Sequence, residues 1–288
     1  MNIREALKRG AETLARQVDV DDPKFESEVL LRYILNVDRA QLFLDLEKEL
    51  DPEKNGLFDE WVKRRSFGEP VAYIIKCREF FGLDFYIDNR VLIPRPETEL
   101  LVENAISYAK AYLTNHSSDK ITIADIGTGS GVVAISVAAN VPQARIYGTD
   151  ISAPALEVAA INCRKHNVTD RVVLLEGDLL NPLPEPVDVL IANPPYVTHA
   201  ELAQMPSARY EPSLALDGGI AGLDKIFRLG DQLNGKVVPG GCVLVEIGKG
   251  QDKEVVSRLQ KSFPTSEIAT VKDLAGIHRA VRLEYTGN

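Results

Sequence analysis

Apolar residues in the first 75 positions recur every three to four residues, which is the spacing of an amphipathic helix. Asp22-Pro23 and Asp51-Pro52 both match a helix start, with a capping Asp followed by Pro at the first helical position. Gly68 and Pro70 interrupt the pattern, and acidic residues alternate with basic ones, as on a solvated helix surface. We therefore predict a small helical N-terminal domain over residues 1–75.

The hydrophobic period changes to two after this region, as in a half-buried strand. Apolar residues alternate with polar or small ones over 81–87, Asp88-Asn89 follows as a turn signal, and an apolar run covers 91–93. This pattern predicts a β-hairpin with strands at 81–87 and 91–93. Pro94-Arg95-Pro96 then forms a stiff extended segment, so we assign 76–96 to a hairpin linker between two domains.

The remaining sequence, 97–288, alternates short apolar strands with helical stretches. The expected helices cover 97–112, 131–140, 153–166, 223–237 and 251–262. The expected strands cover 121–126, 145–149, 172–176, 187–192, 242–247, 268–271 and 280–285, the last being a candidate antiparallel strand. This alternation is typical of βαβ units on a parallel sheet with both faces covered. It predicts a Rossmann-like α/β domain.

Composition narrows the classes of function. The length of 288 residues suggests about two domains, and 33 Lys and Arg against 42 Asp and Glu give a net charge of −9. Neither part of the chain is basic, which argues against a dedicated binder of bare nucleic acid, because such proteins neutralise phosphates with clustered cations. No stretch approaches 18 apolar residues, so no membrane span is expected.

Cysteine usage and the N-terminal segment indicate the compartment. Cys77, Cys163 and Cys242 lie about 80 residues apart, which excludes a local Cys-x-x-Cys metal or redox motif and fits a reducing environment. The first residues lack the apolar core and cleavage site of a secretory signal. We expect a cytoplasmic monomer without bound metal, with neither a membrane nor nucleic acid as a direct partner.

A glycine-rich turn, Asp125–Gly131, lies where the first strand of the second domain leads into a helix. Its glycines permit a tight turn and close approach of a ligand, and the backbone N–H groups suit polar or anionic groups. Asp150 ends the next strand, where a carboxylate can accept both hydroxyl hydrogens of a ribose. The predicted cofactor contacts here are Gly127, Thr128, Gly129, Ser130, Gly131 and Asp150.

Two cofactors remain open on the glycines alone. Residues 129–134 fit the G-x-G-x-x-G/A pattern of dinucleotide sites. The spacing Asp-x-Gly-x-Gly-x-Gly over 125–131 instead resembles motif I of S-adenosylmethionine-dependent methyltransferases. Asp178 and Leu179 follow the third strand, where methyltransferases of this class usually place an acidic residue against the adenine. This position favours S-adenosylmethionine, and both residues join the predicted cofactor contacts.

The candidate reacting site is Asn193-Pro194-Pro195-Tyr196, directly after the fourth strand. The prolines end the strand and hold the segment stiffly. The Asn193 side-chain oxygen and the Pro194 carbonyl can together accept both hydrogens of a planar NH₂ group, while the Tyr196 ring can pack against the flat amide. Such acceptors stabilise the positive charge that develops on nitrogen during methylation. We predict Asn193, Pro194 and Tyr196 as catalytic, all four as substrate-binding, and Asn193 also as a cofactor contact.

The chain resembles the HemK/PrmC family, the protein-(glutamine-N5) methyltransferases that modify peptide-chain release factors. Besides the two motifs above, the resemblance rests on the segments 68–74, 92–99, 209–212, 214–219, 246–248 and 272–276. It spans about residues 65–285. Two local departures, Lys76-Cys77 where many relatives have Thr-Gly and the Ile220-Ala221 spacing, lie outside the tetrapeptide.

The resemblance implies a helical N-terminal domain that grips the substrate protein, a β-hairpin linker and a seven-stranded methyltransferase domain. It also implies S-adenosylmethionine as cofactor, a release factor as partner, and methylation of the glutamine in its Gly-Gly-Gln loop. Arg95 and Glu97 could line the mouth of the pocket or serve only the domain joint.

Other functions stay open on the sequence. A ribosomal-protein glutamine could be the target of the same chemistry, and adenine-N6 methylation of nucleic acid also uses an Asn/Asp-Pro-Pro-Tyr-type site. The charge of −9 disfavours the latter. A nicotinamide-dependent oxidoreductase or a plain nucleotide-binding module is the alternative from another class.

Overall fold

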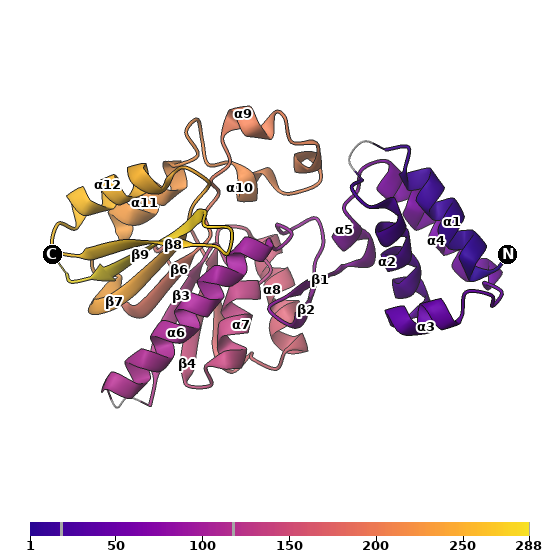
Figure 1. Cartoon of the computed structure of the whole chain (residues 1–288). Coiled ribbons are helices and arrows are strands. Elements are labelled where there is room, and N and C mark those ends of the chain that lie inside the picture. Colours follow the sequence, from indigo (N-terminus) through magenta and orange to yellow (C-terminus); the bar gives the residue numbers. More distant parts are fainter. Residues whose placement is uncertain (18–19, 117–118, 288) are drawn as a thin grey trace. The chain divides into compact units, whose positions relative to one another are not determined.

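The structure is a computed structural model that describes residues 1–17, 20–116 and 119–287. The chain divides into two compact units, Met1–Cys77 and Arg78–Asn288, and Figure 1 traces both along the sequence colours. In the described part of the chain, no helix is both long and apolar enough to cross a membrane.

The first unit is built from helices, as the periodicity predicts. They are α1 (Ile3–Leu14), α2 (Pro23–Leu35), α3 (Arg39–Leu44), α4 (Pro52–Ser66) and α5 (Val71–Ile75). Asp22 accepts a hydrogen bond from the Phe25 N–H, and Asp51 accepts from the N–H groups of Glu53 and Lys54, so both predicted helix starts are confirmed. The apolar faces meet in one core that includes the fully buried Leu30, Leu31 and Phe58.

The structure contains the predicted β-hairpin, but the predicted positions of its strands and turn were wrong. Its strands are β1 (Cys77–Phe80) and β2 (Leu83–Tyr86), joined by a tight turn at Phe81-Gly82 in which both residues have positive φ. Such φ values are those of the two-residue turns whose twist matches a hairpin. The alternating pattern over 81–87 therefore crosses the turn, and no strand forms over 91–93.

Asp88 explains why the second turn signal was misleading. Its carboxylate accepts hydrogen bonds from the Arg90 backbone and side chain and from the Tyr86 hydroxyl, which closes a local loop instead of a hairpin. On α8 (Ala153–Lys165), Asn162 accepts from the Tyr86 N–H and donates to the carbonyls of Tyr86 and Ser130. The end of the hairpin is thereby tied to the glycine-rich turn, and most of the predicted linker, 76–96, lies in the second unit.

The second unit contains a seven-stranded sheet in the order β5-β4-β3-β6-β7-β9-β8. The strands are β3 (Ile121–Ile126), β4 (Ala144–Asp150), β5 (Val172–Glu176), β6 (Val187–Ala192), β7 (Val237–Glu246), β8 (Glu267–Lys272) and β9 (His278–Tyr285). The first five in the chain run parallel, whereas β9 is antiparallel to both β7 and β8. The Rossmann-like seven-stranded fold is confirmed.

Helices cover both faces of this sheet (Figure 1): α6, α7 and α8 on one side, α11 and α12 on the other. They span α6 (Glu99–His116), α7 (Val132–Asn140), α11 (Asp224–Gln232) and α12 (Asp252–Ser262). A one-turn 3₁₀ helix, η1 (Pro96–Thr98), precedes α6, and α9 (His199–Leu202), η2 (Pro206–Arg209) and α10 (Ser213–Leu216) lie between β6 and α11. The helix predicted to reach Val237 ends earlier, because Gly235 turns the chain with a φ of 73° into β7.

Strand order creates the crevice in which a ligand can lie. The chain proceeds from β3 outward to β4 and β5, then returns to place β6 on the other side of β3. Ligands in open α/β sheets bind beyond the carboxyl ends of the strands at such a reversal. Asp125, Asp150 and Asn193 all lie at or directly after these strand ends.

Candidate active site

The backbone of the glycine-rich turn is held by the end of β4. The N–H groups of Gly127 and Thr128 both donate to the Thr149 carbonyl at 2.8 Å. Gly127 and Gly129 have φ values of 71° and 55°, which L side chains rarely adopt. A Cβ atom on either would come no nearer than 3.9 Å to any heavy atom, so both glycines have open space beside them.

Gly131 has a different environment. A Cβ atom there would lie 3.0 Å from Ile135 Cδ1 and 3.3 Å from the Ala159 Cβ, so this glycine lets α7 pack closely against α8. Among the predicted cofactor residues it is absent from the lining of the cavity described below. Its position suggests a packing function.

Asp125 fixes the shape of the turn from beneath. Its carboxylate is 2% exposed and accepts hydrogen bonds from the Thr128 hydroxyl at 2.6 Å and the Ala134 N–H at 3.2 Å. Burial raises the pKa of Asp125 to about 6, while these two hydrogen bonds oppose the shift. Asp125 belongs to the motif recognised in the sequence but was not predicted as a site residue.

Asp150 connects the end of β4 to the glycine-rich turn. Its Oδ2 accepts from the Gly129 N–H at 2.8 Å, and its Oδ1 accepts from the Ser152 N–H at 2.9 Å. Burial raises the pKa of Asp150, and these backbone donors counteract the rise. Each carboxylate oxygen has two lone pairs, so both can still accept a ligand hydroxyl.

Asp178 and Leu179 follow β5 on the same cavity. The Asp178 Oδ2 accepts from Arg228 Nη2 at 2.5 Å, an ion pair that holds the carboxylate at the surface of α11. Leu179 has a φ of 50°, and its carbonyl accepts from the Thr149 hydroxyl at 3.0 Å. Thr149 therefore joins this loop to the glycine-rich turn.

The tetrapeptide lies next to the glycine-rich turn. A Cβ on Gly127 would lie 4.0 Å from the Asn193 carbonyl oxygen. Asn193 Nδ2 donates to Thr98 Oγ1 at 3.0 Å, and the Tyr196 hydroxyl donates to Glu246 Oε1 at 3.1 Å. Burial, followed by the neighbouring Glu246 carboxyl, raises the pKa of Tyr196, so its hydroxyl stays protonated at neutral pH.

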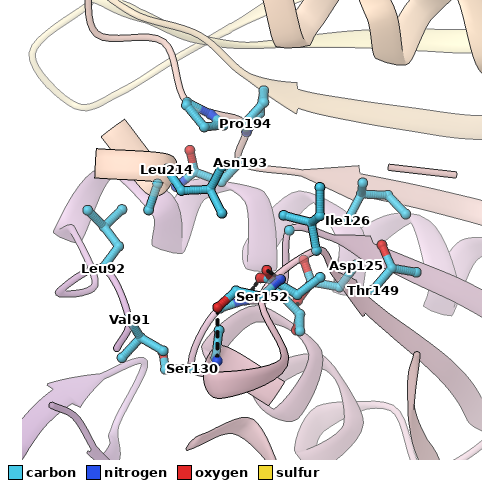
Figure 2. A pocket seen from close by; sticks show the side chains of 18 of the residues that line it. Val91, Leu92, Asp125, Ile126, Ser130, Thr149, Ser152, Asn193, Pro194 and Leu214 are labelled. Carbon is cyan, nitrogen blue, oxygen red and sulfur yellow. Dashed lines mark hydrogen bonds between the residues drawn. The ribbon is translucent and has the colours of Figure 1, made fainter. Parts of the chain in front are cut away.

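Both motifs open onto one cavity (Figure 2). From the sequence prediction, its lining includes Arg95, Gly127, Thr128, Gly129, Ser130, Asp150, Asp178, Leu179, Asn193, Pro194 and Pro195, but neither Tyr196 nor Glu97. Figure 2 shows Leu92 and Leu214 across the space from Ser152, with Val91 on the same side as Leu92 and Asn193 beside Leu214. This apolar wall was not predicted from the sequence, because its residues carry no chemical signal of their own.

A buried ion pair joins the two loops that form this wall. Arg95 Nη2 donates to Glu211 Oε1 at 2.6 Å, and Glu211 Oε2 accepts from the Ile93 N–H at 3.1 Å. The Glu211 side chain is 1% exposed, whereas that of Arg95 is 31% exposed. Glu97 points to another partner, Arg279, at 3.4 Å. Arg95 thus both lines the cavity and holds its wall.

No group of three or more His, Cys, Asp or Glu side chains that could hold a metal ion occurs among the described residues. Asp125, Asp150 and Asp178, which line the cavity, instead accept hydrogen bonds from a hydroxyl, from backbone N–H groups and from Arg228. His199, which follows the tetrapeptide, is 57% exposed and lies 3.0 Å from Asp217.

Known proteins similar to this chain decide its family. Two family models match it, the PrmC N-terminal domain over residues 5–75 and the methyltransferase small domain over residues 101–209. A release factor glutamine methyltransferase of Moorella thermoacetica is 42% identical over 257 residues, 88% of each chain. Another, of Clostridium acetobutylicum, is 35% identical over 288 residues, 98% of each chain. The chain belongs to the release factor glutamine methyltransferase family.

Membership of the release factor glutamine methyltransferase family confirms the resemblance to HemK/PrmC and makes the second unit an S-adenosylmethionine-dependent methyltransferase domain. Its fold agrees with a solved methyltransferase from Pyrococcus furiosus, with a TM-score of 0.50 at 17% identity over 73% of this chain and 91% of that one. A dinucleotide-binding function of the glycine-rich turn is therefore disfavoured.

Proposed function

We propose that this protein transfers a methyl group from S-adenosylmethionine to the side-chain amide nitrogen of the glutamine in the Gly-Gly-Gln motif of a peptide chain release factor. The observation that carries the proposal is the position of Asn193 and Pro194 on the same cavity as the glycine-rich turn. Curated relatives that match nearly the whole chain are named release factor glutamine methyltransferases.

The residues around the cavity fit S-adenosylmethionine. Open space beside Gly127 and Gly129 leaves room for a ligand against the turn, and Asp150 retains acceptor capacity for ribose hydroxyls. We assign the adenosine side of the ligand to Asp150, Asp178 and Leu179, and the remainder to residues 127–130 and Asn193. When bound, S-adenosylmethionine supplies a methyl group on a positively charged sulfur.

The substrate amide is held by acceptors rather than by a base. The Asn193 Oδ1 and the Pro194 carbonyl accept its two hydrogens, which fixes the plane of the amide and exposes the nitrogen lone pair perpendicular to that plane. As the nitrogen takes the methyl group, it becomes positively charged, and the two oxygen dipoles stabilise that charge. Positioning in line with the transferred carbon contributes the rest of the rate enhancement.

Proline and tyrosine restrain these acceptors. Pro194 is buried and Pro195 follows it, so the carbonyl between them belongs to a backbone with little freedom. We propose that the Tyr196 ring packs against the substrate amide while its hydroxyl stays bound to Glu246. The methylated nitrogen returns to a neutral amide when it releases one proton to solvent.

The proposal is tested by incubating the full chain with S-adenosylmethionine carrying a labelled methyl group and a purified release factor. Mass spectrometry should place the label on the Gly-Gly-Gln glutamine, and a release factor with Gln→Ala at that position should stay unlabelled. Parallel reactions with ribosomal proteins and with adenine-containing DNA test the two alternative targets. Absence of label on the release factor, with an enzyme that is folded and binds S-adenosylhomocysteine, would refute the proposal.

The compartment, the oligomeric state and the partners of the enzyme are predictions made from the sequence. We propose that the protein acts in the cytoplasm as a monomer on a protein partner, without a membrane or nucleic acid as direct partner. The net charge of −9 supports a protein rather than a nucleic acid target. We further propose that residues 1–75 recognise the substrate protein and that 97–288 form the catalytic domain.

A further inference from the structure

A buried carboxyl group lies directly behind the tetrapeptide. Glu246 is the last residue of β7 and is 1% exposed. Its Oε1 accepts the hydrogen bond from Tyr196, and its Oε2 is buried without a hydrogen-bond partner in the described part of the chain. Burying a carboxyl group in this way costs free energy, so its presence beside the reacting residues calls for a functional reason.

Thr98 connects this carboxyl to Asn193. Thr98 belongs to η1, is 3% exposed, and its hydroxyl oxygen accepts from Asn193 Nδ2 at 3.0 Å. A hydroxyl group has one hydrogen to donate, and the neighbouring Glu246 carboxyl, whose Oε2 is otherwise unpaired among the described residues, can accept it. Because Asn193 Nδ2 donates to Thr98, the Thr98 hydrogen is left to turn toward the Glu246 carboxyl, to which Tyr196 also donates.

We propose that Thr98 and Glu246 are positioning residues that fix the orientation of the Asn193 amide, with Nδ2 toward Thr98 and Oδ1 toward the substrate. This inference rests on the proposed function, which requires Oδ1 to accept a hydrogen of the substrate amide. The two ends of an asparagine amide have nearly the same shape but opposite polarity. A flipped Asn193 would present N–H donors to the substrate NH₂ group and could not hold it.

The carboxylate determines the direction because it can only accept. Burial raises the pKa of Glu246 to about 7; the hydroxyls of Thr98 and Tyr196 lower it, Glu97 raises it and Arg279 lowers it. Below that pH the protonated carboxyl can donate to Thr98, whose hydrogen is then free to turn toward Asn193. We therefore expect kcat to rise with pH through about 7 as Glu246 ionises.

The test compares three variants that change hydrogen bonding with little change in shape. Thr98→Val removes the hydroxyl, Thr98→Ser keeps it, and Glu246→Gln introduces an N–H donor in place of an acceptor. For each, the release factor methylation rate, the KM for the release factor and the Kd for S-adenosylhomocysteine are measured, with circular dichroism as the folding control.

We expect Thr98→Val and Glu246→Gln to lower kcat by about tenfold or more, as for other preorganised dipoles near a reacting centre. The Kd for S-adenosylhomocysteine should change less than about twofold, Thr98→Ser should retain near-normal kcat, and Glu246→Gln should lose the pH dependence near 7.

Two results would overturn the proposal: normal kcat in Thr98→Val, or equal losses in Thr98→Ser and Thr98→Val, which would indicate packing alone. A Glu246→Gln variant that fails to fold leaves the Thr98 pair to decide. If the wild-type enzyme leaves the release factor glutamine unmethylated, the proposed function fails first, and the orientation proposal fails with it.

Discussion

Glu246 should make the stability of the second unit depend on pH in a direction opposite to that of most carboxylates. Burial raises its pKa from the ordinary value of 4.5 to about 7. Between these values the folded protein keeps a proton that the unfolded chain loses. The stabilisation is therefore fully present below about 4.5 and is lost as the pH rises through about 7. The difference between the two pKa values corresponds to about 3 kcal/mol.

The perturbation is Glu246→Gln, which keeps the size of the side chain and removes its ionisation. The free energy of unfolding is measured by urea titration between pH 5 and pH 8 for both proteins. Circular dichroism reports on both units, and the fluorescence of the single tryptophan, Trp61 in α4, reports on the first unit, so the two signals together separate the unfolding of the second unit. Relative to the variant, the wild type should lose about 1.4 kcal/mol per pH unit between about pH 5 and pH 7, and the difference should level off above that.

Comparison with the variant isolates Glu246 from the other buried carboxyls, such as Asp125. Burial also raises the pKa of Asp125 to about 6, but Asp125 is present in both proteins and its contribution cancels in the difference. Glu254→Gln makes the same chemical change at an exposed position of α12 and serves as the matched control. Parallel pH profiles of wild type and Glu246→Gln would show that Glu246 ionises as it does in the unfolded chain, and would refute the reasoning.

Three further substitutions test the site. Asn193→Ala should lower single-turnover methylation by about 10²–10³-fold, because it removes one of two acceptors, while S-adenosylhomocysteine binding stays intact; near-normal turnover would contradict its role. Asp150→Ala should weaken S-adenosylhomocysteine binding about tenfold in calorimetry through lost hydroxyl hydrogen bonds, and an unchanged Kd would argue against this placement. Glu211→Ala should lower Tm by several degrees in a thermal shift assay, since it leaves Arg95 without its buried partner; an unaltered Tm would mean that the pair contributes nothing.

Structural features whose residues all lie in one short segment could be predicted from the sequence. The glycine-rich turn is an example, since its strand, its glycines with positive φ and its helix are consecutive in the chain. The hairpin shows how such reasoning fails. Two candidate turns, Phe81-Gly82 and Asp88-Asn89, were compatible with the alternating pattern, and the better-known turn residues formed a side-chain-closed loop instead.

Contacts between distant segments could not be predicted in this way. Thr98 contacts Asn193 across 95 positions of sequence, and Glu211 contacts Arg95 across 116. No residue near Thr98 in the sequence marks its hydroxyl as a hydrogen-bond acceptor for the tetrapeptide. Asn193 becomes its neighbour only when the chain folds and η1 meets the carboxyl end of β6. Residues that position a reacting group therefore require the fold, whereas the reacting group itself can be recognised from local chemistry.

The arrangement of charges also explains how this site can methylate an amide without a general base. A carboxylate touching the substrate would favour proton removal, and an amide nitrogen is too weakly acidic to benefit from that before it is methylated. Here the Glu246 carboxyl is absent from the cavity lining and contacts the Tyr196 hydroxyl. The negative charge of Glu246 therefore orients neighbouring hydroxyl and amide dipoles. The amide dipole of Asn193 in turn stabilises the positive charge that develops on the substrate nitrogen. A site built for nucleophilic nitrogen therefore gains more from an acceptor held in one orientation than from a stronger base.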